Sequence, residues 1–374
     1  MRIGIDARMY GPKQGGLGRY IEQLIKNLEK IDSANEYIIF LRKENFEEFQ
    51  PANSNFKKVL ADVYWYGLAE QTKIPKIIKQ QKVDLMHFPH WNVPYFYNGP
   101  FMVTIHDLIL FHYPTRRAST RSVIVYWLKH QAHKILIKKI SKKAKKIITP
   151  SEFTKQDIHK TLKIPLQKIF VTLLSPQPQE QKQNNISHKE LFKKFNINKP
   201  YALYVGVAYP HKNLEGLVDA WHDFEKKYGD NFQLILVGKK NYFYDRLINS
   251  KKFKQCKNII FTDYLNDDEL NTIYSGAMLY VFPSLYEGFG LPPLEAMTHH
   301  VPVISANSAC LPEILGSAAL YFDPKNPEEI TQALYNGFTN QNLRLNLIQQ
   351  SQQILKKYSW LETAKRTLQI YKTY

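Results

Sequence analysis

Short apolar segments alternate with amphipathic segments along almost the whole chain, and this alternation constrains the fold more than any other feature. The apolar runs predict buried strands, and the segments between them show the three- and four-residue spacing of helices. This order favours parallel sheets, because two parallel strands need a crossover long enough to hold a helix. The first predicted strands are residues 2–6, 37–41, 58–60, 83–87, 101–105, 146–149 and 170–174.

A polar, proline-containing stretch interrupts this alternation. Its sequence, SPQPQEQKQNN at 175–185, has no periodicity and is typical of a linker. A second set of predicted strands comprises residues 201–207, 232–237, 258–261, 278–282 and 303–305. We therefore predict an α/β protein with two Rossmann-like domains, and 374 residues are enough for each to bury its own core. The predicted parts are a first domain at 1–175, a linker at 176–198, a second domain at 199–357, and a C-terminal helix of about 358–374 that packs back on the first domain.

Residues 278–300, MLYVFPSLYEGFGLPPLEAMTHH, combine a predicted strand, a glycine loop and the start of a helix. Gly288 and Gly290 let backbone N–H groups approach a ligand closely, and the helix start behind them favours negative charge. Glu287 and Glu295 flank the turn, and ionised carboxylates accept hydrogen bonds from sugar hydroxyl groups. The pattern indicates a phosphate site beside sugar sites. Taken alone, the Glu spacing would favour an ordinary strand–loop–helix corner with Glu295 as a solvated helix residue.

The full string EGFGLPPLEA resembles the donor-site signature of retaining glycosyltransferases of family 4. The resemblance implies the GT-B fold, in which two Rossmann-like domains face each other across a cleft. It implies that Glu295 holds the ribose of the nucleotide and that Glu287 lies beside the donor sugar. The backbone expected to bind the donor diphosphate is that of Gly288, Phe289, Gly290 and Leu291.

A second motif, YVGVAYPHKNLEGL, places Lys212 between a predicted strand and a predicted helix. A lysine there can point at a diphosphate as a mobile charge. The motif resembles the family's Gly-Arg followed by Arg/Lys-Lys, and Lys212 is its match. Val207 replaces the usual Arg, and His211 stands where a second basic residue is common. The residues left as candidates for the missing cation are Arg8, Arg19 and Lys239.

The N-terminal half carries further candidates at the ends of predicted strands. Gly15 and Gly16 lie in DARMYGPKQGGLGRY, which fits a plain turn but resembles the family's glycine loop facing the donor diphosphate and the acceptor. His106 follows a predicted strand, and its THD string resembles the family's histidine near the reacting centre. His87 and His90 form an HxxH pair, but no Cys or carboxylate completes a metal set, so we expect hydrogen-bonded loop histidines.

The net charge of +18 lies mainly in the first half of the chain, where residues 1–175 hold 29 Lys and Arg against 14 Asp and Glu. Such a balance predicts an anionic partner. Residues 116–146 contain eleven Lys and Arg and no acidic residue. Apolar residues recur there at helical spacing, at 124, 128, 132, 135, 136 and 140. This basic amphipathic helix fits an anionic membrane surface, and it fits equally well a helix whose apolar stripe packs on the sheet.

The resemblance to family 4 implies a retaining hexosyltransferase that moves a sugar from a nucleotide donor to a glycan or lipid-linked glycan acceptor. IDARM and GGLGRY resemble mannosyltransferases of polysaccharide assembly, which makes GDP-mannose the first choice of donor, ahead of a UDP-sugar. The chain has no DxD string, so we expect neither a metal nor any other cofactor. His106, Lys212 and Glu287 are the predicted catalytic residues. Two cysteines and no signal sequence predict a cytoplasmic protein, peripheral on the inner membrane face if the basic helix touches lipid.

Two other functions remain open at this point. A nucleotide-sugar epimerase or a phosphorylase could use the same fold, without a glycan acceptor. A basic nucleic-acid-binding protein is disfavoured, because the charge lies in one half and no nucleic-acid motif accompanies it.

Overall fold

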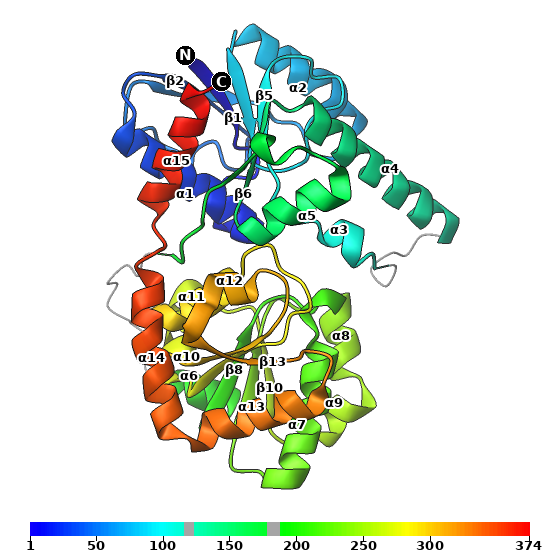
Figure 1. Ribbon diagram of the computed structural model, residues 1–374, viewed down its shortest axis with the longest axis vertical. Helices are drawn as coiled ribbons and strands as arrows, with labels where there is room; N and C mark the ends of the chain where they lie inside the picture. The colour runs from blue at the N-terminus through cyan, green and yellow to red at the C-terminus, as the bar shows by residue number, and fades with distance from the viewer. Residues whose placement is uncertain (116–122, 178–187) are drawn as a thin grey trace. The chain divides into compact units, whose positions relative to one another are not determined.

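The computed structural model describes residues 1–115, 123–177 and 188–374, apart from the side chains of 123–126 and 129. The chain divides into two compact units (Figure 1). Unit 1 contains residues 1–111, 121–174 and 359–374. Unit 2 contains residues 112–120 and 175–358. The predicted linker range 176–198 falls partly outside the described residues, and its described part contains α6 (His188–Phe195).

Unit 1 is built on a parallel sheet, which confirms the predicted α/β class. Its seven described strands are ordered β3-β2-β1-β4-β5-β6-β7. They are β1 (Arg2–Asp6), β2 (Glu36–Leu41), β3 (Phe56–Leu60), β4 (Leu85–Phe88), β5 (Phe101–Thr104), β6 (Lys146–Thr149) and β7 (Ile169–Val171). Every residue of β4 and β5 is buried, as expected for strands whose two faces are both covered by helices.

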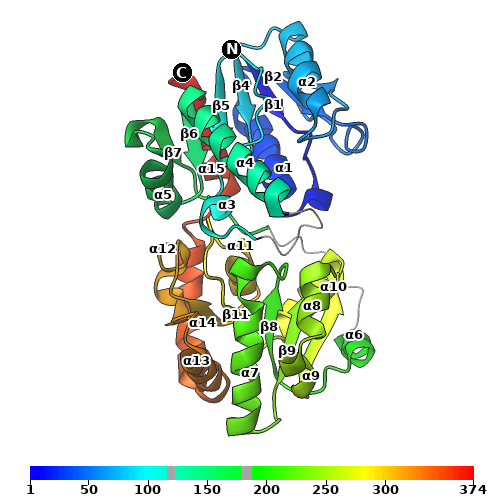
Figure 2. The same ribbon diagram turned by 90° about the vertical axis from the view of Figure 1, so that its right-hand side faces the viewer.

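Helices cover both faces of this sheet (Figure 2). They are α1 (Gly15–Ile31), α2 (Leu68–Gln80), α4 (Val123–Lys143), α5 (Glu152–Leu162) and α15 (Trp360–Lys372), with short 3₁₀ turns at Pro12–Gln14 and Leu166–Lys168. The short helix α3 (Ile109–His112) has no buried residue and ends at the first residue assigned to unit 2. The core between sheet and helices includes Ile38, Met86, Val103, Ile137 and Ile140. Two of these residues, Ile137 and Ile140, come from α4, so that helix is anchored to the sheet by one face.

The C-terminal helix α15 belongs to unit 1, where it packs beside α1 (Figure 1). Tyr371 on α15 is fully buried, and its hydroxyl lies 2.6 Å from Nδ1 of His87 on β4. The other ring nitrogen of His87 lies 2.8 Å from Oγ1 of Thr104. Thr363, near the start of the helix, donates a hydrogen bond to the carbonyl of Leu173. These buried contacts fix the end of the chain to the first sheet.

Unit 2 is built on a second parallel sheet, with six described strands in the order β10-β9-β8-β11-β12-β13. They are β8 (Tyr201–Val205), β9 (Gln233–Val237), β10 (Ile259–Asp263), β11 (Leu279–Phe282), β12 (Val303–Ala306) and β13 (Ala319–Phe322). The sequence predicted five of these strands but not β13, which pairs along its whole length with β12. The helices are α6, α7 (Leu214–Tyr228), α8 (Tyr242–Ile248), α9 (Lys251–Gln255), α10 (Asp267–Gly276), α11 (Leu291–Thr298), α12 (Leu311–Leu315), α13 (Pro327–Thr339) and α14 (Gln341–Leu355), with 3₁₀ turns at Pro210–Lys212 and Gly316–Ala318.

Candidate active site

The order of strands in unit 2 locates its candidate site. The chain builds the sheet outward in one direction from β8 to β10, then returns to the other side of β8 with β11. The connections that leave β8 and β11 therefore diverge at the carboxyl ends of these strands. Open parallel sheets bind their ligands at such a switch point. Lys212 follows β8 and Glu287 follows β11, so both predicted residues lie at this point of the sheet.

Lys212 and Glu287 form an ion pair between the two connections. Nζ of Lys212 donates to Oε1 of Glu287 at 2.6 Å, and the two side chains are only 16% and 9% exposed. A backbone hydrogen bond of 2.7 Å, from the N–H of Leu285 to the carbonyl of His211, holds the two loops together beside the pair. Nζ of Lys212 also lies 5.6 Å from the ring centre of Phe282. The lysine commits one of its three N–H donors to Glu287 and can direct the others at a ligand.

His211 does not add a second positive charge beside Lys212. The side chain is buried, and burial together with the neighbouring Lys212 lowers the pKa of its imidazole to about 4. The ring is therefore neutral at pH 7. Within residues 206–213, all of which the structure describes, Lys212 is thus the one cation where the family resemblance leads us to expect two.

The glycine loop before α11 has a backbone that requires glycine at its end. Gly290 adopts φ 93°, a left-handed conformation, and a Cβ there would lie 2.8 Å from Cδ2 of Leu311. No side chain in the described part of the chain caps the helix. Pro292 and Pro293 lack N–H groups, so the donors at this helix start come from the residues before them. This confines any anion held by the helix start to the glycine loop itself.

Glu295 lies one turn into α11 and is partly exposed. The hydroxyl of Tyr274 donates to its Oε2 at 3.4 Å, and the Tyr274 ring stacks on His299 with 5.1 Å between ring centres. Burial, with nearby charges including Glu295, raises the pKa of Tyr274 well above its usual value. Tyr274 therefore stays protonated and positions the carboxylate. Sequence reasoning missed this tyrosine, because nothing in its local pattern separates it from a core residue.

Unit 1 has its own switch point, between β1 and β4, and a buried ionic cluster lies there. Arg8 donates to both carboxylate oxygens of Asp6 at 2.8 Å and to Oε1 of Glu70 at 2.7 Å. Asn92 donates to the same Glu70 oxygen at 2.7 Å. Burial would lower the pKa of Arg8, but Asp6 and Glu70 raise it above its usual value. Arg8 is therefore committed to these carboxylates, and it is a poor candidate for the missing diphosphate cation.

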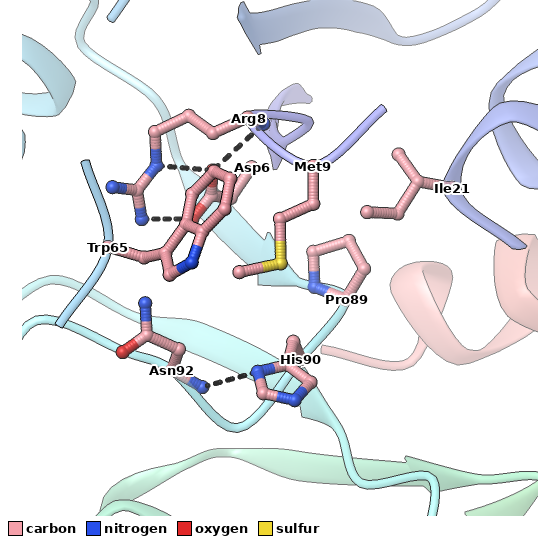
Figure 3. A pocket seen from close by; sticks show the side chains of 8 residues that line it. All are labelled: Asp6, Arg8, Met9, Ile21, Trp65, Pro89, His90 and Asn92. Atoms are coloured by element: carbon pink, nitrogen blue, oxygen red, sulfur yellow. Dashed lines mark hydrogen bonds and ion pairs between the residues drawn. The ribbon is translucent and has the colours of Figure 1, made fainter. Parts of the chain in front are cut away.

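Asp6, Arg8 and Asn92 of this cluster line a small hollow in unit 1 (Figure 3). Met9, Ile21, Trp65, Pro89 and His90 complete the lining (Figure 3). Its volume of about 10 Å³ has room for a single water-sized group. His90 accepts a hydrogen bond from the backbone N–H of Asn92 at 3.3 Å, as expected for a loop histidine. Sequence reasoning missed Glu70 and Asn92, which are far from β1 in sequence and are brought to it by the fold.

His106 and the two glycines also lie in unit 1. Nε2 of His106 donates to the carbonyl of Pro89 at 2.9 Å, and its ring packs edge-on against Tyr20. Burial lowers the pKa of His106 to about 4, so the neutral ring offers Nδ1 as an acceptor. Gly15 and Gly16 form the exposed start of α1, and no atom of the described residues lies within 4 Å of a Cβ added at either position. That open backbone leaves room for a ligand at the helix start.

The fold brings Lys212, Glu287, the 288–291 loop and Glu295 together in unit 2, and the remaining predicted residues belong to unit 1. Of the other candidate cations, Lys239 is exposed just after β9, and Arg19 is partly exposed on α1. Among the described residues, no three His, Cys, Asp or Glu side chains cluster in a way that could hold a metal ion. No helix in the described part of the chain is long and apolar enough to cross a membrane.

Comparison with known proteins identifies relatives over nearly the whole chain. Residues 14–172 match the model of Glycosyltransferase Family 4, and residues 187–354 match that of Glycosyl transferases group 1. The O-antigen chain mannosyltransferase B of Escherichia coli is 27% identical over 373 residues, which cover 96% of each chain. Sucrose-phosphate synthase from Thermosynechococcus elongatus, a GT-B protein, has a similar structure, with a TM-score of 0.75 at 18% identity over 100% of this chain and 98% of that one. HepE of Anabaena, solved in complex with UDP and glucose, has a TM-score of 0.71 at 14% identity over 100% and 99% of the two chains.

Proposed function

Because the chain belongs to glycosyltransferase family 4 and has the GT-B fold, we propose that it transfers a sugar from a nucleotide diphosphate donor to a glycan or lipid-linked glycan, with retention of configuration. The observation that carries this proposal is the Lys212–Glu287 pair beside the glycine loop. The proposed diphosphate-binding ammonium of Lys212 and the proposed sugar-side carboxylate of Glu287 are in contact there at 2.6 Å. The proposed first donor is GDP-mannose, which the E. coli mannosyltransferase relative supports, and UDP-sugars are the alternative.

In the proposed reaction the diphosphate leaves the anomeric carbon and gains negative charge. The spare N–H donors of Lys212 and the backbone N–H groups at 288–291 stabilise that charge. Preorganised donors of this kind commonly supply the largest single catalytic contribution. Glu287, on the sugar side, stabilises the positive charge that develops at the anomeric carbon. Glu295 holds the ribose, with Tyr274 fixing its carboxylate.

The proposed reaction needs no metal ion or cofactor, because Lys212 and the loop take the role that a metal would have at the diphosphate. His106 is the proposed contact to the donor sugar from unit 1, because the Nδ1 atom of its neutral ring can accept a hydrogen bond from a sugar hydroxyl group. Gly15 and Gly16 are proposed to contribute backbone donors. We also propose that the protein works at the cytoplasmic face of a membrane, and the two free cysteines, Cys256 and Cys310, are consistent with a reducing compartment.

Thermal melting with GDP, UDP and ADP tests the donor assignment, since a ligand that binds the folded state raises apparent stability. We expect GDP to raise the melting temperature most. Incubation of the matching nucleotide-sugar with mannosyl acceptors in EDTA should yield product of retained configuration by NMR. Consumption of the donor without an acceptor would instead indicate an epimerase, and consumption that requires inorganic phosphate would indicate a phosphorylase.

A further inference from the structure

The outward face of α4 carries a continuous stripe that the core of unit 1 does not cover. The stripe is Leu128, Ala132, Ile135, Lys139 and Lys142, and all five side chains are exposed. Leu128 is 67% exposed and Ile135 is 57% exposed, although both belong to the apolar pattern. The opposite face, with Ile137 and Ile140, is the one that packs on the sheet. The core therefore buries only part of the apolar residues of this helix.

A second segment, distant in sequence, extends this face. Tyr95 and Phe96 lie in the loop between β4 and β5 and are 49% and 60% exposed. Nζ of Lys139 is 3.4 Å from the hydroxyl of Tyr95 and 5.5 Å from the centre of its ring. Lys143 donates to Asn98 Oδ1 at 2.8 Å. The loop and the second half of α4 thus form one surface, which we call the α4–loop surface.

A cavity of about 270 Å³ opens between the two segments. Its lining combines the aromatic side chains of Tyr95, Phe96 and Tyr97 with the ammonium groups of Lys139 and Lys143. Neither the loop at 93–98 nor residues 123–143 contain an Asp or Glu, so no carboxylate from these two segments neutralises the lysines. Each ammonium has three N–H donors. Lys139 directs one at the Tyr95 hydroxyl, and Lys143 directs two, at the carbonyl of Tyr97 and at Asn98 Oδ1. Two donors of Lys139 and one of Lys143 therefore remain for an incoming phosphate group.

From this arrangement we propose that the α4–loop surface binds an anionic phospholipid membrane, and that the cavity takes a lipid phosphate headgroup. Phe96, Leu128 and Ile135 enter the interface between headgroups and acyl chains, while the lysines extend their charged ends to the phosphates. Tyr95 suits the boundary, because its ring is apolar and its hydroxyl is polar. A nucleic acid matches the charge but offers no acyl region for Phe96, Leu128 and Ile135. The proposal gives the membrane location of the proposed function a named surface, and vesicle binding tests it without any enzyme activity.

Sedimentation of the full-length protein with vesicles provides the test. We expect strong binding to vesicles of phosphatidylglycerol and phosphatidylcholine, weak binding to phosphatidylcholine alone, and release by salt. The variant K139Q/K142Q should lower the partition coefficient about 30-fold, since each lysine near an anionic surface contributes roughly fivefold. Its control, K251Q/K254Q, removes two exposed lysines of α9 in unit 2 and should bind like wild type.

The apolar part of the surface needs its own variants, because charge alone would also draw the protein to anionic lipid. F96Q and I135Q leave the charge unchanged, and each should lower the partition coefficient by about tenfold. L345Q on α14 is the control, since Leu345 is as exposed as Ile135 at 57%. Wild-type binding by F96Q and I135Q would overturn the proposal. An equal loss of vesicle binding in K139Q/K142Q and in the control K251Q/K254Q would also overturn it. So would retention of the protein by RNA on filters with no binding to vesicles.

The outcome for the enzyme reaction is separate. Binding to anionic vesicles by a protein that consumes no nucleotide-sugar would support the surface and refute the proposed function. Sugar transfer to a water-soluble acceptor by a protein that does not bind vesicles would support the proposed function and refute the membrane surface.

Discussion

The Lys212–Glu287 pair gives the sharpest test of the candidate active site, because its loss should affect stability and activity in different ways. The two side chains are 16% and 9% exposed and in contact at 2.6 Å. Lys212→Met leaves the Glu287 carboxylate without its ammonium partner. Glu287→Gln leaves the Lys212 ammonium without its carboxylate partner. Breaking a fully buried pair costs about 3–5 kcal/mol, so for this partly exposed pair we expect each single variant to lose about 2–3 kcal/mol.

The double variant K212M/E287Q removes both charges and should be destabilised by only about 1–2 kcal/mol. A double-mutant cycle should therefore give a coupling energy of about 3 kcal/mol. Because the chain has two units, hydrogen exchange of the β8 and β11 amides is a better readout than a single global melting curve. Losses in stability that simply add in the double variant would refute the ion pair as a stabilising contact.

Activity should not follow stability in this cycle. Lys212→Met should lower turnover by about 10²–10³, and the double variant should not recover it, because the donor to the leaving diphosphate is still missing. Glu287→Gln should lower turnover as well. It should nevertheless bind the free nucleoside diphosphate more tightly, on the order of tenfold, since it removes a negative charge close to the phosphates. A double variant with wild-type turnover would show that another cation holds the diphosphate.

Three further predictions concern groups around the two switch points. Glu295→Gln should raise KM for the donor by one to two orders of magnitude, as expected for a lost hydrogen bond to a charged group of roughly 1.5–3 kcal/mol, and leave kcat nearly unchanged; a fall in kcat alone would contradict the ribose assignment. Tyr371→Phe should lower the free energy of unfolding of unit 1, measured by hydrogen exchange, by about 1–3 kcal/mol, because it leaves a buried nitrogen of His87 unpaired. Burial and the neighbouring His106 lower the pKa of His87 from 6.5 to about 3, so the unfolded chain binds the proton more readily. His87 therefore contributes stability to unit 1 that is fully present above pH 6.5 and is lost as the pH falls toward 3. At pH 5 the loss from this group is about 2 kcal/mol, and His87→Gln should remove that part of the pH dependence.

The strands were readable from the sequence where burial makes them continuously apolar. Residues 2–6 and 146–149 coincide with β1 and β6, and most other predicted strands differ from the observed ones by one or two residues at an end. The missed strand β13 is ALYF, a short run at an edge of the sheet that follows a glycine-containing turn. Its place depends on pairing with β12, a contact between segments that local periodicity does not report.

The candidate site was readable only in part, for a similar reason. Glu287, Glu295 and Lys212 lie in motifs whose glycines and prolines stand out in the sequence. The direct contact between Lys212 and Glu287 was not predictable, because 75 residues separate them. The same holds for Glu70, which reads as an ordinary charged residue of α2 and is completely buried against Arg8. Spacing along the chain identifies a motif, but the topology of the sheet decides which motifs meet.

The two sheets place ionic groups at equivalent switch points, yet these groups suit different ligands. In unit 1, Arg8 serves two carboxylates, Asp6 and Glu70, and its guanidinium also donates to the carbonyl of Val63. A cluster with more carboxylates than cations repels a diphosphate, and its acceptor oxygens are suited to the hydroxyl groups of a neutral sugar. In unit 2, Lys212 faces one carboxylate and retains N–H donors beside a glycine loop whose helix has no side-chain cap. That arrangement can take up the charge of a departing phosphate. The charges therefore support the proposed division, in which unit 2 would bind the nucleotide and unit 1 the sugar acceptor, although both units use the same parallel-sheet topology.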